Sequence, residues 1–240
     1  MNPAGTGDPG LRLDRALVDA GLARSRAQAS EAVRDGRVRV NGRVVTRPAH
    51  PVAATDALEL AGGDHYVSRA AHKLVGALAA SGVTVPARVL DAGASTGGFT
   101  EVLLDRGARE IVAADVGYGQ LAWSLRSDDR VIVMERTNVR ELTAEAIGGP
   151  VDLVVADLSF ISLATVLPAL TACASDVADI VPMVKPQFEV GKDRVGAGGV
   201  VSDPELRADA VLTVARRAAE LGWHAVDVTA SPLPGPSGNV

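Results

Sequence analysis

From residue 68 onward, short runs rich in Val, Ile and Leu alternate with helical segments, and this alternation constrains the fold most. The runs predict strands over 88–91, 110–115, 131–135, 151–157, 180–184 and 223–229. Helices are predicted between them, notably over 68–81, 98–106, 163–173 and 204–221. Strands that alternate with helices in this way are typical of a parallel sheet covered on both faces. We therefore predict an α/β fold, with the glycine-containing segment 185–203 as a loop over the site.

The first 60 residues follow a different pattern. Apolar residues at helical spacing predict a short helix over 11–20, and Ser25 is placed to cap a second one. The pair Asn41-Gly42 lies between alternating valines, which is the strongest short-range signal of a hairpin. A further strand is predicted at 57–60. This pattern indicates a small α+β domain.

Charge is distributed unevenly along the chain. Residues 12–47 hold nine arginines and four acidic residues, a local net charge of +5, whereas residues 61–240 carry −7. We predict an N-terminal domain over 1–62, a linker over 63–67 and a second domain over 68–240. A basic domain joined to an acidic one indicates that the basic domain binds a polyanion. The alternative is a solvated arginine-rich surface, which has the same composition.

Several classes of protein are disfavoured by the composition. Cys173 is the only cysteine, which excludes an intramolecular disulfide and a cysteine zinc site and fits a reducing cytosol. The four histidines show no ligand spacing, so no metal is expected. No run approaches 18 apolar residues, and the first ten residues lack the apolar core of a secretory signal. We expect a cytoplasmic protein with no membrane contact.

A glycine-rich turn follows the first predicted strand of the parallel sheet and opens a helix. Residues 90–99 read Leu-Asp-Ala-Gly-Ala-Ser-Thr-Gly-Gly-Phe, and such a turn lets a ligand lie against backbone N–H groups. Ser95 stands where the dinucleotide fingerprint has the glycine that admits a pyrophosphate. A nucleotide ligand without a pyrophosphate, such as S-adenosylmethionine, does not need that glycine. Asp115 ends the next strand, at the spacing of an acid that binds ribose hydroxyls. The alternative is a glycine-rich connection without a ligand.

The same turn also matches the nucleophile elbow of hydrolases. Gly93-Ala94-Ser95-Thr96-Gly97 fits G-x-S-x-G, in which the serine is the nucleophile. A hydrolase would need an acid and a histidine further along the chain, and only His224 follows. Hydrolases of this class also place several strands before the elbow, whereas a hairpin domain precedes it here. We therefore disfavour this interpretation.

Lysine is rare in this chain. Of 24 basic residues only Lys73, Lys185 and Lys192 are lysines. Arginine stays protonated in proteins, whereas a buried lysine can lose its proton and act as a base. Lys185 and Asp157 each follow a predicted strand, and ligands of open parallel sheets lie at the carboxyl ends of the strands. Either the two residues belong to an active site, or they form a structural ion pair at the sheet edge.

Five stretches closely resemble the TlyA family, bacterial S-adenosylmethionine-dependent 2′-O-methyltransferases of rRNA that are sometimes labelled hemolysins. The stretches are 93–100, 114–121, 151–167, 184–192 and 231–239. The resemblance extends over essentially residues 11–240. It implies an S4-type RNA-binding domain followed by an FtsJ-like, Rossmann-like methyltransferase domain. It also implies rRNA or ribosomal subunits as the partner.

The resemblance implies a catalytic Lys-Asp-Lys-Glu tetrad, to which Lys73, Asp157 and Lys185 contribute three members. The family pattern Pro-Ser-Gly-Asn-x-Glu would place the Glu, and then the last strand of the sheet, directly after Val240. The implied S-adenosylmethionine site comprises Gly93, Ala94, Ser95, Thr96, Gly97, Gly98, Phe99, Asp115, Val116 and Asn138, the last near the adenine. The implied RNA contacts are Arg12, Arg15, Arg24, Arg26, Arg37 and Arg39, which would bind phosphates.

The implied reaction is methylation of a cytidine ribose in 16S or 23S rRNA. Lys185 would remove the proton of the 2′-hydroxyl as that oxygen attacks the methyl group. Asp157 would orient the amine, and Lys73 beside it would disfavour a second positive charge. Two other hypotheses are a non-catalytic RNA-binding or ribosome-assembly factor and a pore-forming hemolysin, the latter without any spanning segment in the sequence.

Overall fold

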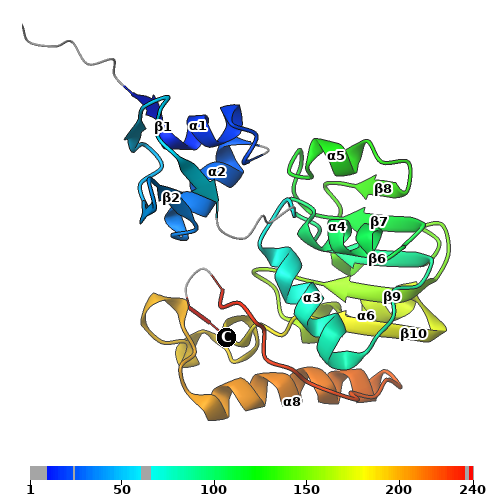
Figure 1. The fold of residues 1–240 in the computed structure, drawn as a ribbon. Coiled ribbons are helices and arrows are strands. Elements are labelled where there is room, and N and C mark those ends of the chain that lie inside the picture. Colours follow the sequence, from blue (N-terminus) through cyan, green and yellow to red (C-terminus); the bar gives the residue numbers. More distant parts are fainter. Residues whose placement is uncertain (1–9, 24, 61–65, 236–237, 240) are drawn as a thin grey trace, which may run out of the picture. The chain divides into compact units, whose positions relative to one another are not determined.

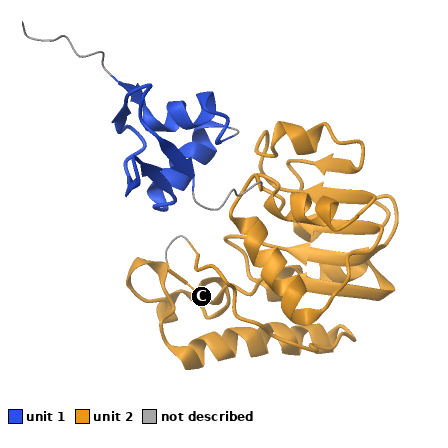
Figure 2. Ribbon diagram, viewed as in Figure 1, with its two compact units in different colours: residues 1–65 blue, residues 66–240 orange. Residues whose placement is uncertain are grey.

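The computed structural model describes residues 10–23, 25–60, 66–235 and 238–239. The chain forms two compact units, Met1–His65 and Tyr66–Val240, which we call the head and the body (Figures 1 and 2). Each unit has its own apolar core. Among the described residues, no helix combines the length and apolar character that crossing a bilayer requires.

The head combines two short helices with two small antiparallel sheets. Its elements are β1 (Leu11–Arg12), α1 (Leu13–Asp19), α2 (Arg26–Arg34), β2 (Val38–Val40), β3 (Arg43–Val44), β4 (Pro51–Val52) and β5 (Leu58–Leu60). One sheet has the order β3-β2-β5, and β1 pairs with β4 in the other. Leu13, Leu17 and Val33 are fully buried and pack against the valines of β2.

Local sequence signals explain most of the head. The Ser25 hydroxyl accepts a hydrogen bond from the backbone N of Gln28 (3.2 Å), which caps α2 as predicted. Asn41 and Gly42 have φ values of 51° and 75°, so the hairpin turn uses two left-handed residues. Leu11 was expected in a helix but lies in β1, because its backbone pairs with Val52 from the far end of the head.

The body contains a five-stranded parallel sheet, which confirms the predicted Rossmann-like α/β class. Its strands are β6 (Arg88–Ala92), β7 (Glu110–Ala114), β8 (Val131–Met134), β9 (Val151–Ala156) and β10 (Ala174–Pro182). Its longer helices are α3 (Ala70–Ser81), α4 (Gly98–Asp105), α6 (Leu163–Cys173) and α8 (Pro204–Glu220), with a short α5 (Trp123–Arg126). The order β10-β9-β6-β7-β8 reverses between β6 and β9 (Figure 1). In open parallel sheets this switch point is where ligands bind.

Both faces of the sheet are covered. Successive strand residues point to opposite faces, so Val89 packs with α3 and α4 whereas Leu90 packs with α6 and α8. The core under α6 includes Cys173, and burial raises the pKa of its thiol to about 11. Two apolar layers therefore fix the strand ends that carry the site.

The prediction of a strand over 223–229 is wrong. These residues follow α8 without regular structure, and Val226 and Val228 are 92% and 68% exposed. A strand needs a neighbour for its backbone N–H and C=O groups, and no described segment pairs with this one. Alternation of apolar residues was therefore not sufficient to form a strand here.

The segment 185–203 is only partly the loop that we expected. It contains the short helix α7 (Pro186–Glu189) and the 3-10 helices η2 (Lys192–Arg194) and η3 (Ala197–Gly199). Pro186 opens α7, where its missing N–H has no helical partner to lose. The strand before it begins at Ala174, earlier than predicted, with a register irregularity between Ala174 and Asp179.

Candidate functional site

The glycine-rich turn joins β6 to α4 at the carboxyl edge of the sheet. Gly93 and Gly97 have φ values of 91° and 99°, a region that favours glycine. A Cβ on Gly93 would lie 2.9 Å from the backbone O of Asp157, so only glycine lets the turn pack against the end of β9. Ser95 also adopts a positive φ, 49°, which is uncommon for a residue other than glycine.

Asp115 supports this turn from the end of β7. Its Oδ2 accepts a hydrogen bond from the backbone N of Ser95 (2.9 Å). Val116, the next residue, is 75% exposed. Asn138 follows β8 and caps the 3-10 helix η1 (Val139–Glu141) by accepting a hydrogen bond from the backbone N of Arg140. The structure thus brings Asp115 to the turn and places Val116 and Asn138 on the adjoining loops.

A cavity of about 150 Å³ lies between the turn and the end of β9. Its lining includes most of the predicted cofactor residues and two of the predicted catalytic residues. The lining residues are Ser68, Ala70, Gly93, Ala94, Ser95, Thr96, Gly98, Phe99, Asp157, Ser159 and Lys185. Asp115, Val116 and Asn138 are outside this lining. The cavity joins the turn to a cluster of charged side chains.

That cluster consists of one carboxylate between two ammonium groups. Asp157 Oδ1 lies 2.7 Å from Lys185 Nζ, and Asp157 Oδ2 lies 3.6 Å from Lys73 Nζ. Only 13–17% of each side chain is exposed. Asp157 follows β9, Lys185 follows β10 and precedes α7, and Lys73 lies in the first turn of α3. Three separate elements thus converge on one point.

The cluster has two further members that the sequence did not reveal. Lys185 Nζ donates a hydrogen bond to Ser159 Oγ (2.8 Å), and Lys73 Nζ lies 3.5 Å from Met183 Sδ. Ser159 stands two residues after Asp157, in the stretch that carries the resemblance, and this proximity was the one available signal. The Ser159 contact fixes Lys185 Nζ from a second direction.

Below the turn, Asp91 is a fully buried carboxyl group on β6. Its Oδ2 accepts a hydrogen bond from Thr100 Oγ1 on α4 (2.6 Å), and its Oδ1 has no hydrogen-bond partner among the described residues. Burial is the main cause that raises the pKa of Asp91 to about 7. The Asp91–Thr100 bond ties β6 to the helix that the turn opens.

We expect Asp91 to make the stability of the body depend on pH. The unfolded carboxyl releases its proton near pH 4, whereas the folded one keeps it until about pH 7. The free energy of unfolding should therefore fall by about 4 kcal/mol as the pH rises from about 4 to about 7. Asp91→Asn should remove this loss. Urea unfolding followed by Trp123 and Trp223 fluorescence, which reports on the body alone, measures it at pH 4.5 and 8. Identical pH dependence of the wild type and the variant would contradict the expectation.

The hydrolase interpretation finds no support in the geometry. The Ser95 hydroxyl is paired with Gln120 Oε1 (3.3 Å). His224 lies exposed in the irregular segment after α8. No described histidine is hydrogen-bonded to Ser95, so a Ser-His pair is absent from the described part of the chain.

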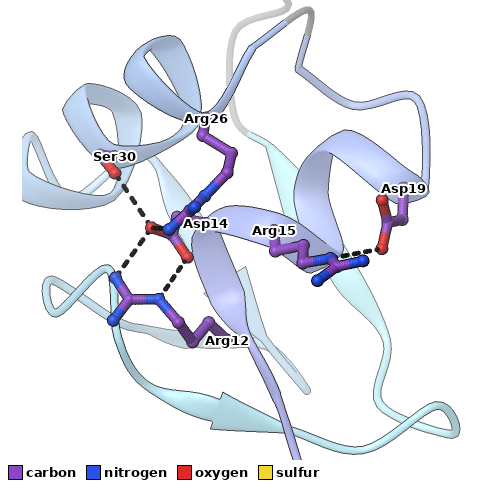
Figure 3. A network of polar contacts seen from close by, with 6 residues as sticks. All are labelled: Arg12, Asp14, Arg15, Asp19, Arg26 and Ser30. Carbon is purple, nitrogen blue, oxygen red and sulfur yellow. Dashed lines mark hydrogen bonds and ion pairs between the residues drawn. The ribbon is translucent and has the colours of Figure 1, made fainter.

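The head presents most of its predicted RNA-binding arginines to solvent. Arg12 and Arg26 share Asp14 (Figure 3), and Arg15 pairs with Asp19 along α1. Arg39 points outward from β2, and the side chain of Arg37 is 27% exposed. Arg24 lies outside the described residues. The described arginines come from β1, α1, α2, β2 and the α2–β2 turn.

Comparison with known families assigns both units. The FtsJ-like methyltransferase family matches residues 66–240, and the S4 domain matches residues 11–58. These matches cover the unit that holds the cavity and the unit that carries the arginines.

Individual proteins are similar over nearly the whole chain. The 16S/23S rRNA (cytidine-2′-O)-methyltransferase TlyA of Mycobacterium tuberculosis is 69% identical over 95% of this chain and 87% of its own length. Hemolysin A of Brachyspira hyodysenteriae is 36% identical over 96% and 97%, respectively. A solved structure of a Streptococcus thermophilus protein described as a hemolysin has a TM-score of 0.76 and 38% identity, covering 96% of this chain and 86% of its own.

Proposed function

The chain belongs to the TlyA family of FtsJ-like methyltransferases with an N-terminal S4 domain, and from this premise we propose that it methylates the ribose 2′-hydroxyl of cytidines in 16S or 23S rRNA, or both. The proposed methyl donor is S-adenosylmethionine. The observation that carries this proposal is the convergence of Lys73, Asp157 and Lys185 beside a glycine-rich turn at the switch point of the sheet.

The residues around the turn fit this cofactor. The cavity wall from Gly93 to Thr96 carries no side chain larger than threonine, so backbone groups are accessible to a ligand. The Asp115 carboxylate at the end of β7 is suited to accept hydrogen bonds from ribose hydroxyls. Asn138 would lie beside the adenine. When bound, S-adenosylmethionine supplies an electrophilic methyl group on sulfur.

Replacement of Asp115 by alanine tests this placement. The variant loses an acceptor for ribose hydroxyls and also the hydrogen bond that supports Ser95. We expect the affinity for S-adenosylmethionine, measured by calorimetry, to fall about ten- to hundredfold. Asp176→Ala, at an exposed position of β10, is the matched control and should bind normally. Unchanged affinity of Asp115→Ala would refute the assignment of Asp115.

Lys185 is the proposed general base. Asp157 pairs with both lysines, but only Lys185 lines the cavity, so Lys185 is the lysine that a substrate bound there can reach. Lys185 Nζ can then take the proton of the 2′-hydroxyl as that oxygen attacks. Asp157 and Ser159 hold Nζ in place, and Lys73 pairs with the other carboxylate oxygen of Asp157. The protein contributes mainly alignment and this proton transfer.

The head is the proposed rRNA-binding part. Its arginines would bind phosphates and so orient the ribosomal substrate, while the body performs the chemistry. The competing proposal is a non-catalytic RNA-binding factor that retains the cofactor fold.

Mass-spectrometric mapping of 2′-O-methyl groups distinguishes these two proposals. The full-length protein is incubated with S-adenosylmethionine and with 30S or 50S subunits that lack the modification. We expect a new 2′-O-methylcytidine in at least one rRNA. Tight binding of subunits without any new methyl group would favour the non-catalytic factor.

A further inference from the structure

The head contains a buried acid that the proposed function does not use. Asp14 lies in the first turn of α1, and only 3% of its side chain is exposed. Arg12 donates from Nε to Asp14 Oδ1 (3.0 Å) and from Nη2 to Asp14 Oδ2 (2.9 Å), a bidentate pair. Arg26 Nη2 and Ser30 Oγ donate to Oδ2 from α2, at 3.2 and 3.4 Å (Figure 3). One carboxylate therefore links β1, α1 and α2.

The two guanidinium groups remain accessible even though their shared acid is covered. Arg12 and Arg26 expose 52% and 61% of their side chains. The bonds to Asp14 use two of the five N–H donors of Arg12, and a phosphate can bind the others. Arg12 is the main cause that holds the pKa of the Asp14 carboxyl well below its usual range. Asp14 is therefore charged wherever RNA binds, and the three groups together carry +1.

The second acid of α1 provides a contrast. Asp19 is 55% exposed and lies 3.6 Å from Arg15 Nε in a simple i,i+4 pair. Such a surface pair leaves both side chains free to reorient. The Asp14 cluster instead fixes two arginines from two directions. Both acids lie on α1, and Figure 3 shows the two arrangements together.

We propose that Asp14 is a positioning residue for RNA binding, which holds Arg12 and Arg26 as a preformed site for a phosphodiester group of the RNA. Long cationic side chains lose conformational freedom when they bind, and a site that is already ordered avoids much of that loss. The arrangement also presents guanidinium forks, which suit phosphate oxygens. The inference rests on the proposed function, because it takes rRNA as the ligand.

Because Asp14 is negatively charged, the direction in which RNA affinity changes on its replacement tests the proposal. Removing an acid from an RNA-binding surface should, from charge alone, strengthen RNA binding. The positioning role predicts the opposite for Asp14→Asn. We expect its affinity for purified 16S and 23S rRNA to fall about five- to thirtyfold, although the protein becomes more positive. The control Asp19→Asn removes the same charge from the same helix and should bind rRNA as tightly as the wild type or up to about twofold more tightly.

Two further measurements distinguish a loss of arginine positioning in Asp14→Asn from unfolding of the head. The slope of log affinity against log salt should become shallower by about one for each RNA phosphate that the variant no longer binds. In methylation assays the KM for rRNA should rise while kcat changes little, because the body is untouched. Circular dichroism checks that the head is folded. If Asp14→Asn unfolds it, Arg12→Lys, which keeps the charge and loses the bidentate pair, should bind rRNA at least fivefold more weakly.

Specific outcomes would overturn the proposal. A folded Asp14→Asn variant that binds rRNA as tightly as Asp19→Asn, with an unchanged salt slope, excludes the positioning role. Wild-type affinity of Arg12→Lys does the same if the first variant is unfolded. If the wild-type protein itself does not bind rRNA, the proposed function of the head fails, and the inference fails with it.

Discussion

Replacing Lys185 with arginine is expected to slow methyl transfer about 10²- to 10⁴-fold, the range for loss of a general base. Arginine keeps the positive charge and approximate length, but it does not release its proton near neutral pH. Asp157 can still pair with the guanidinium, so the fold and the cofactor site should persist. The measurement is single-turnover methylation of ribosomal subunits at saturating cofactor and protein.

Lys192→Arg is the matched control for this experiment. Lys192 lies exposed in η2, outside the cavity lining, and its replacement makes the same chemical change. We expect its rate to equal that of the wild type. If Lys185→Arg also stays within about threefold of the wild-type rate, the lysine forms a structural ion pair and another group is the base.

Removal of residues 1–60 is expected to weaken rRNA binding by about a hundredfold or more at moderate salt. The deleted part holds all six arginines proposed to contact phosphates. If each of them binds one phosphate, the slope of log affinity against log salt should become shallower by about four to five. Binding of labelled rRNA at several salt concentrations measures both quantities.

Cofactor affinity is the internal control for the truncated protein. The body has two apolar cores of its own, one on each face of the sheet, and the cavity is lined by body residues alone. S-adenosylmethionine should therefore bind the truncated protein as it binds the whole chain. An unchanged salt slope for rRNA would show that the head is not the RNA-binding part.

What the sequence predicted well depended on local interactions. The Asn41-Gly42 hairpin, the Ser25 cap and the Gly97–Gly98 start of α4 are set by residues within a few positions of each other. The carboxyl ends of β9 and β10 were predictable for a similar reason, because a parallel sheet must bring them to one edge. Asp157 and Lys185 could be placed together on that ground.

What the sequence missed depended on distant partners. The rarity of lysine singled out Lys73, but only the family resemblance placed it beside Asp157, because nothing local shows that α3 will carry its amine there. Residues 223–229 have the alternation of a strand but no neighbouring strand among the described residues. Asp14 counted in the sequence only as a charge that reduces the positive balance of the head. Its burial and its bond to Arg26 follow from the packing of α1 against α2, whereas Arg12 lies in β1, only two residues before Asp14.

The close approach of Gly93 to the backbone of Asp157 limits how this enzyme could be re-engineered for bulkier methyl-donor analogues. Enlarging the turn at Gly93 would push on the strand end that orients Lys185, so gains in donor range would come with losses in rate. The Gly97 side offers no easier route, because its φ of 99° also favours glycine and a Cβ there would clash with the buried side chains of Leu125 and Leu121.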